Sequence, residues 1–149
     1  MSACSLIFAL LTALAQHASH RAQAPVGTWK YDVASVRVVP NAATQAKLGD
    51  PKQAAATKAM LAKIKAEAVQ SLRPMRLVFK ANRQFTLLGE KGQVVAYGIW
   101  NLYGDTIKAV AGNMKESTPT LELTKDKTRI HATFSDPGFG SLKTDLVRG

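Results

Sequence analysis

Polar and hydrophobic residues alternate along two long parts of the chain, and this period of two is typical of half-buried β-strands. The first part covers residues 26–39, where Trp29 and Tyr31 are separated by polar side chains. It ends at Pro40, because proline cannot donate a hydrogen bond within a sheet. The second part begins after Pro74 and consists of short alternating segments separated by turn residues such as Gly, Asn and Asp.

Seven strands are predicted in this second part, which brings the total to eight. We place them near residues 75–81, 85–87, 94–102, 106–111, 121–123, 130–134 and 142–148. Successive short strands joined by hairpins favour an up-and-down barrel, because closure removes the exposed edges of an open sheet. The interior of an eight-stranded barrel is just wide enough to be filled by side chains or to hold one small ligand.

The segment between the first two strands has a helical pattern instead. Residues 41–48 are rich in Ala, and Gly49 stands where helices often end. Asp50-Pro51 predicts the start of a second helix that continues to Arg73, because Asp caps free N–H groups and Pro is tolerated in a first turn. One apolar stripe follows this helix through Leu61, Ile64, Ala68 and Leu72.

Together these patterns predict a mainly β (α+β) fold. It is an eight-stranded antiparallel up-and-down barrel with a helical pair inserted between strands 1 and 2, at about residues 41–73. With 149 residues, 46% of them hydrophobic, the chain is long enough for one domain with its own core. We therefore expect a single domain over residues 25–149.

Residues 1–24 predict a signal peptide. The apolar run at 6–15 is too short to span a bilayer, and small residues follow at the spacing that signal peptidase prefers. The segment before that run lacks Lys and Arg, and Pro25 is a poor residue after a cut at Ala24. A start further upstream, a cut nearer Ala15 or Ala18, and a buried N-terminal helix therefore stay open as alternatives. We expect a secreted or periplasmic protein.

The amino-acid composition limits which metal sites, disulfides and binding partners can be expected. Cys4 is the only cysteine and lies in the predicted signal, so we expect neither disulfides nor cysteine metal sites in the mature protein. The chain has 20 Lys and Arg against 10 Asp and Glu, a net charge of +10. Such a charge attracts an anionic envelope polymer or a lipid surface, although it also serves solubility alone. The basic residues are scattered, which together with export makes nucleic acid an unlikely partner.

Catalytic and metal-binding residues are not evident. His131 is the only histidine after the predicted signal, and strand alternation with Ile130 and Ala132 places it outside the barrel. Most Asp residues stand at turns, where Asp favours the local backbone conformation. No His, Cys or acidic cluster has metal-ligand spacing. We therefore predict a protein that is not an enzyme and has no metal site and no cofactor.

Aromatic residues are the better candidates for binding. Phe79, Phe85 and Trp100 fall on the inward face of their strands. We predict that they line a small apolar pocket, closed by Leu61, Ile64 and Leu72 of the helix. The alternative is that these aromatics form a plain packed core.

The residues Gly27-Thr28-Trp29, at the head of the first strand, resemble the Gly-x-Trp motif of the lipocalin (calycin) superfamily. This resemblance implies that Trp29 plugs one end of a barrel and stacks against an Arg near the end of the last strand, the position of Arg148. The later strand and turn pattern, including Phe85-Thr86 and Gly98-Ile99-Trp100, resembles bacterial lipocalin-like domains of unknown function. The helical pair departs from the family, which usually has a long loop there.

Fatty-acid-binding proteins also carry two helices at this place, but they use more strands and a buried Arg pair that cannot be assigned here. The resemblance thus implies an exported, non-enzymatic binding protein that carries a small apolar ligand in its barrel. The alternative is a solidly packed barrel that acts through its basic surface on an anionic envelope component or a partner protein.

Overall fold

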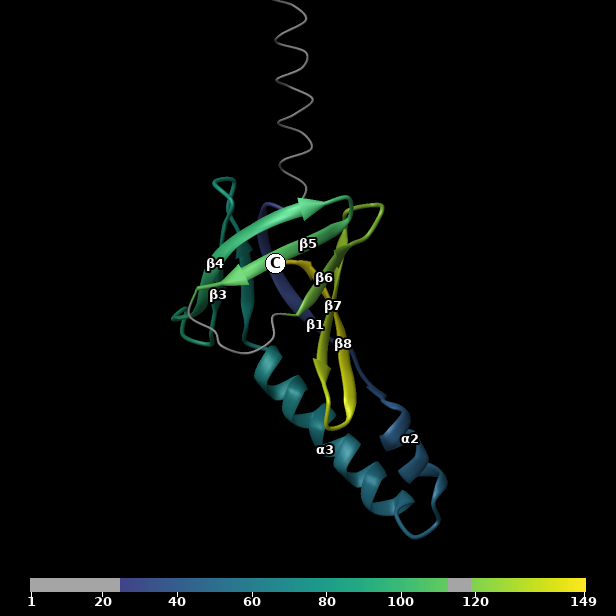
Figure 1. The fold of residues 1–149 in the computed structure, drawn as a ribbon. Coiled ribbons are helices and arrows are strands. Elements are labelled where there is room, and N and C mark those ends of the chain that lie inside the picture. Colours follow the sequence, from purple (N-terminus) through teal and green to yellow (C-terminus); the bar gives the residue numbers. More distant parts are fainter. Residues whose placement is uncertain (1–24, 113–118) are drawn as a thin grey trace, which may run out of the picture.

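A computed structural model describes residues 25–112 and 119–149 of the chain (Figure 1). The predicted signal peptide at 1–24 lies outside the described residues. This part of the chain forms eight strands and two helices, in the order β1 (Gly27–Pro40), α2 (Ala42–Gly49), α3 (Ala54–Leu72), β2 (Arg76–Phe79), β3 (Gln84–Leu88), β4 (Val94–Tyr103), β5 (Thr106–Ala111), β6 (Thr120–Leu123), β7 (Arg129–Asp136) and β8 (Gly140–Arg148).

The strands form a closed antiparallel barrel in which each strand pairs with its neighbour in the chain and β8 pairs with β1. The predicted eight-stranded barrel is therefore confirmed, as is the helical pair between β1 and β2. The β1–β8 pairing extends from Trp29–Arg148 to Pro40–Gly140 and is interrupted between Asp32 and Arg37. This irregularity lets one long strand bend around the barrel.

Antiparallel pairing gives the barrel two distinct ends. The odd-numbered strands all run toward one end, which carries the helices and the connections β3–β4, β5–β6 and β7–β8. We call this the helix end. The opposite end holds the start of β1 and the end of β8, and we call it the Trp29 end.

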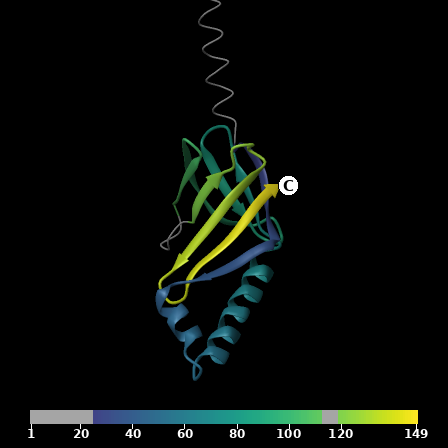
Figure 2. The same ribbon diagram turned by 90° about the vertical axis from the view of Figure 1, so that its right-hand side faces the viewer.

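The two helices form a hairpin that extends away from the barrel (Figures 1 and 2). Only residues 73–75 separate α3 from β2, so the last turn of α3 must lie at the rim of the barrel. The helix has 19 residues, a length of about 28 Å, and most of it therefore lies beyond the rim. Contacts of α3 with other elements are mainly to β1 and α2.

The start of α3 differs from the sequence prediction. The helix begins at Ala54, and Asp50-Pro51 belongs to the turn that precedes it. Asp50 accepts hydrogen bonds from the backbone N–H of Lys52 (2.9 Å) and the side chain of Gln53 (2.8 Å). The capping residues were recognised, but they stabilise the turn between the helices instead of the helix itself.

Core side chains come from all eight strands and from the last turn of α3. The buried cluster consists of Trp29, Tyr31, Val36, Leu72, Leu77, Phe79, Phe85, Trp100, Ile107, Leu121, Leu123, Ile130, Ala132 and Leu146. No charged residue is buried in the described part of the chain; its buried polar residues are Thr44, Thr57 and Thr144. The interior is thus uncharged, as the alternation pattern requires.

Candidate functional site

Trp29 closes one end of the barrel. Its side chain is fully buried, and its indole N–H donates a 2.8 Å hydrogen bond to the carbonyl of Pro25. The Arg148 guanidinium lies 4.1 Å from the centre of the Trp29 ring and donates to the Val26 carbonyl at 2.6 Å. This is the contact that the resemblance implied. It covers the indole with a cation held by the backbone just before β1.

Gly27 makes room for this contact. Its φ of +129° is unfavourable for residues with a side chain, and a Cβ at this position would lie 2.6 Å from Nη1 of Arg148. Partial burial also lowers the pKa of the Arg148 guanidinium. The three residues Gly27, Trp29 and Arg148 therefore form one closely packed structural unit.

The three aromatics predicted to bind a ligand lie together in the core. Phe79 and Trp100 meet edge to face, with ring centres 5.6 Å apart, and Phe85 belongs to the same cluster. Trp100 is fully buried, and its indole N–H donates to the carbonyls of Lys80 and Gln84. These side chains therefore contact one another and the backbone, the arrangement that a packed core requires.

Leu61 and Ile64 do not approach the three aromatics. The core cluster reaches α3 at Leu72, with Ala68 and Val69 packed against it, and does not extend to Leu61 or Ile64. Of the three helix residues predicted to close the pocket, Leu72 lies in the core cluster with the aromatics, whereas Leu61 and Ile64 do not. The short connection to β2 fixes only the last turn of α3 at the rim and directs the first turns outward.

Apolar side chains at the helix end are less completely covered. Five residues that pack against the core from the ends of β3, β5, β7 and from β8 remain partly exposed: Leu87, Ala109, Ala111, Phe134 and Leu142. Three further inward positions nearby carry only small groups, namely Ala96, Gly98 and Ala132. Sequence reasoning missed this group, although the run of small residues at inward positions of β4 and β5 was its visible signal.

Tyr31 lies on β1 between the Trp29 end and the helix end. Only 8% of its surface is exposed, and burial raises the pKa of its phenol to about 12. Its hydroxyl makes no hydrogen bond to another residue of the described chain. Every fully enclosed side-chain nitrogen or oxygen in that part of the chain does have a partner. The Tyr31 hydroxyl is therefore not fully enclosed, and it borders space that solvent can reach.

His131 lies on the outer surface of the barrel, as the alternation predicted. Its Nδ1 is 2.7 Å from Oδ1 of Asp145, whose second oxygen lies 3.4 Å from Arg129. Ser35 is close, but its hydroxyl bonds the backbone N–H of Asp145 and does not contact the imidazole. Ser35, His131 and Asp145 therefore do not form the hydrogen-bonded series of nucleophile, base and acid that nucleophilic catalysis needs.

Metal-binding clusters and membrane-spanning helices are absent from residues 25–112 and 119–149. No group of three or more His, Cys, Asp or Glu residues there can hold a metal ion. None of the helices in that range is both long and apolar enough to cross a membrane. An open depression of about 490 Å³ lies along α3, lined by Ala62, Lys65, Ala66, Val69, Gln70 and Arg73.

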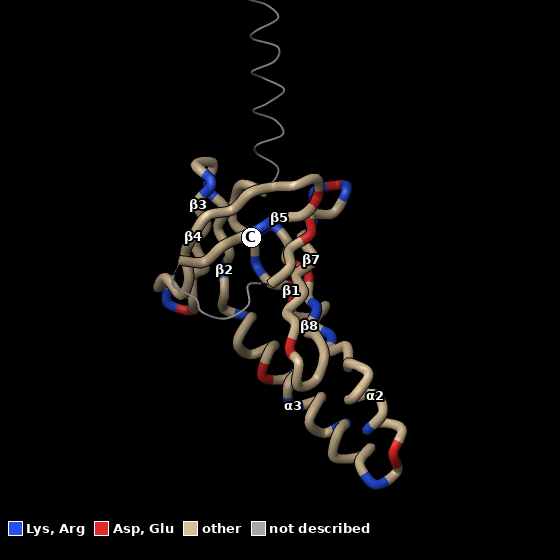
Figure 3. Tube along the Cα trace, viewed as in Figure 1, with Lys and Arg blue, Asp and Glu red and all other residues tan. Residues whose placement is uncertain are grey.

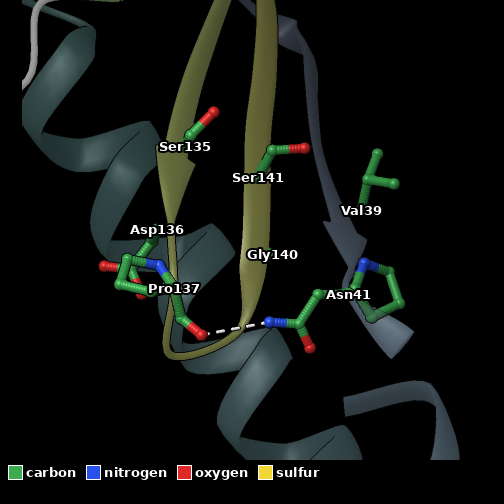
Figure 4. Close-up of a pocket in the computed structure, with 8 residues that line it drawn as sticks. Val39, Asn41, Ser135, Asp136, Pro137, Gly140 and Ser141 are labelled. Atoms are coloured by element: carbon green, nitrogen blue, oxygen red, sulfur yellow. Dashed lines mark hydrogen bonds between the residues drawn. The ribbon is translucent and has the colours of Figure 1, made fainter. Parts of the chain in front are cut away.

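A second open depression, of about 520 Å³, lies between the end of β1 and the β7–β8 turn (Figure 4). The Asn41 side chain donates to the Pro137 carbonyl and also caps α2 by accepting from Thr44. At Gly140, with φ of +136°, a Cβ would lie 2.1 Å from the Val39 carbonyl. These contacts attach the helical hairpin to the β7–β8 turn, which gives the region a structural role.

The outer surface of β4 and β5 is unusually apolar. Six of the eight large hydrophobic side chains that are exposed in the described part of the chain lie there: Val94, Val95, Tyr97, Ile99, Tyr103 and Val110. We call this the β4–β5 face. Its one charged outward residue is Lys108, which lies 5.1 Å from the Tyr103 ring centre. Lys and Arg are otherwise spread over the barrel and the helices (Figure 3).

Comparisons with known proteins add a fold likeness alone. No protein-family model matches the chain, and a search of curated proteins gives no match. Among solved structures, the chain is similar to a DUF4847 family protein from Bacteroides vulgatus, with 15% sequence identity and a TM-score of 0.46. The match covers 84% of this chain and 94% of that protein. A likeness at this level carries no information about function.

Proposed function

We propose that this protein is a lipocalin-like, exported and non-enzymatic binding protein that takes a small apolar ligand through the helix end of its barrel. The observation that carries the proposal is the partial exposure of inward-facing apolar side chains at that end, whereas Trp29 at the other end is fully buried. Partly exposed apolar surface favours an apolar ligand, because binding removes that surface from water.

The binding residues in this proposal differ from those predicted from sequence. The base of the proposed ligand site is formed by Phe79, Phe85 and Trp100. The walls are the partly exposed positions, of which Ala109, Ala111 and Phe134 are examples. Gly27, Trp29 and Arg148 hold the opposite end closed, so a ligand enters past the helix end.

The test is a fluorescence titration with the apolar probe N-phenyl-1-naphthylamine. We expect wild-type protein to bind it at one site per chain. Ala111→Phe places a large side chain at an inward position and should weaken binding at least tenfold. Val110→Phe is the matched control, because Val110 is the neighbouring residue on β5 and points outward, 62% exposed.

Thermal unfolding of both variants shows whether they fold, since overpacking costs about 1–3 kcal/mol. The proposal is wrong if the folded wild-type protein binds neither this probe nor any member of a lipid panel. It is also wrong if Val110→Phe and Ala111→Phe weaken binding equally, because the probe would then lie on the outer surface.

The second candidate function is action through the surface on an anionic envelope component. Two observations favour it: the net charge of +10 and the β4–β5 face, where Tyr103 and Lys108 stack. Apolar and tyrosine side chains beside a cation suit the boundary of an anionic lipid layer. If the interior of the barrel is solidly packed, the protein would act through this surface.

Flotation with vesicles of phosphatidylglycerol, compared with phosphatidylcholine, tests this candidate. Binding to the anionic vesicles alone, with loss at 0.5 M salt, would support it, because salt screens surface charge. Ile99→Ser should reduce that binding, while Met60→Ser on α3 should not, although both residues are exposed. Absent or salt-independent binding contradicts the candidate.

A further inference from the structure

We propose that the β4–β5 face is the interface of a homodimer, in which two copies of this chain pack face to face about a two-fold axis close to Ile99 and Val110. The dimer is independent of the apolar ligand proposed for the barrel. It places a second copy of the chain on the β4–β5 face, instead of the lipid layer of the second candidate function. Three observations support it: the size of the apolar surface, the distribution of charge, and the position of the one cation.

The apolar surface of the β4–β5 face is large enough for a dimer. Its six hydrophobic side chains are 40–62% exposed, with Ile99 at 56% and Val110 at 62%. At roughly 150–250 Å² for a large side chain, they expose about 600 Å² per copy, or about 1,200 Å² when two copies meet. Stable interfaces begin at about 1,200 Å². The exposed Gln84 and Asn101 supply the polar rim that such interfaces carry.

Charge distinguishes this face from the rest of the barrel. The strands β3, β4 and β5 together contain one charged residue, Lys108, whereas β1 and β8 contain three each. Two copies that each have a net charge of +10 repel each other, so they approach most easily where each presents the least charge. Surfaces that recognise anionic lipid usually carry a cluster of about four to eight Lys or Arg, and this face offers one.

The position of Lys108 indicates the direction of the two-fold axis. Ile99 and Val110 are paired across β4 and β5, and Lys108 lies two residues before Val110, about 7 Å along the strand. An axis that runs between the two sheets and across their strands at this pair places the two Lys108 residues on opposite sides, about 14 Å apart. That separation exceeds the screening length of about 8 Å at physiological salt, so the two cations add little repulsion.

Sedimentation velocity at about 1 to 200 μM protein measures the dimer, for which we expect a Kd of about 10 μM, because the interface is at the small end of the stable range. Ile99→Lys and Ile99→Glu should each weaken the dimer at least tenfold, because two like charges then meet at its centre. An equal mixture of the two variants should associate again, because the charges are then opposite. Met60→Lys is the matched control, since Met60 is an exposed hydrophobic residue of α3, and it should dimerise as wild type.

Circular dichroism shows whether the variants fold, and salt separates a second copy from a lipid layer. The dimer should be as tight or tighter at about 0.5 M salt, which screens the repulsion between two basic copies and would release the protein from phosphatidylglycerol vesicles. The proposal is wrong if the wild-type protein stays monomeric over this concentration range, or if the dimer persists in both Ile99 variants. It is also wrong if the mixture fails to associate. A monomer that binds the vesicles more tightly as Ile99→Lys would assign the face to lipid. The probe titration tests the barrel ligand separately from all of these results.

Discussion

The two ends of the barrel carry different side chains and differ in how completely these side chains are buried. At the Trp29 end, a fully buried indole is covered by a guanidinium, and residues of β1 and β8 close the interior. At the helix end, inward positions carry Ala, Gly or partly exposed Leu and Phe, and the helices lead away from the rim. The first arrangement stabilises the fold, whereas the second leaves apolar surface accessible. The proposed function therefore assigns stability and binding to opposite ends.

The largest contrast is expected between Trp29→Ala and Leu142→Ala. Removing the buried indole should lower the free energy of unfolding by about 3–5 kcal/mol, because it leaves a cavity and strips Arg148 of its stacking partner. Leu142 is partly exposed, so its truncation should cost about 1 kcal/mol. Urea unfolding followed by tryptophan fluorescence or circular dichroism measures both. Equal losses would show that the two ends are packed alike.

The pH dependence of the free energy of unfolding tests the burial of Tyr31, which lies between the two ends of the barrel. Its pKa is about 12 in the folded protein against an ordinary 10.0, so the folded state keeps the phenol proton that the unfolded state loses. Stability should therefore be unaffected by Tyr31 below about pH 9 and fall as pH rises from 10 to 12, by roughly 2–3 kcal/mol in total.

Urea unfolding at pH 8, 10 and 11 on wild-type protein and Tyr31→Phe isolates this effect from the titration of lysines. The stability difference between the two proteins should change with pH in favour of Tyr31→Phe. A constant difference would mean that the phenol ionises equally easily in both states.

Arg148→Met tests the cation on the closed end. The variant keeps much of the packing but loses the stacked charge and the bond to the Val26 carbonyl, so we expect a loss of about 1–2 kcal/mol. Arg83→Met is the matched comparison, because Arg83 lies 4.9 Å from the Trp100 ring centre and is exposed. Its loss should be smaller. A larger loss of stability for Arg83→Met would show that the Arg83–Trp100 contact contributes more than the Arg148–Trp29 contact.

The smallest effect is expected on the part of α3 that lies beyond the barrel. Leu61 is partly exposed and outside the core cluster, so Leu61→Ala should cost about 1 kcal/mol or less. Leu72→Ala, at the buried last residue of the same helix, should cost more than twice as much. Differential scanning calorimetry gives both values. A loss at Leu61 equal to that at Leu72 would show that the whole helix covers the core.

Alternation along the strands was sufficient to predict the barrel, since each inward residue of a two-sided strand must meet a core. The stacking of Arg148 on Trp29 was expected from the resemblance of Gly27-Thr28-Trp29 to a known motif, and the guanidinium lies 4.1 Å from the ring centre. Alternation identifies the inward face, but it does not say how deep each residue lies. Phe79 and Ala111 are both inward, yet one is fully covered and the other is partly exposed.

The direction of α3 relative to the barrel could not be predicted from the sequence either. The apolar stripe of α3 indicated burial along its length, whereas only Leu72 reaches the buried core. The decisive constraint is the three-residue connection to β2, whose effect depends on where β2 lies in three dimensions. Asp50 showed a similar ambiguity, because the hydrogen bonds that cap a helix also stabilise a turn.

The contact between Arg148 and Val26 joins residues 122 positions apart in the chain. Contacts of such long sequence separation form late in folding, because the intervening chain must first be brought together. Hairpins among β2 to β8 need only local pairing, but the Trp29 plug requires β8. During synthesis, β1 therefore emerges long before β8, and Arg148 can cover the indole only after β8 has followed. Closure of the barrel by β8 and the stacking of Arg148 on Trp29 thus belong to the same step.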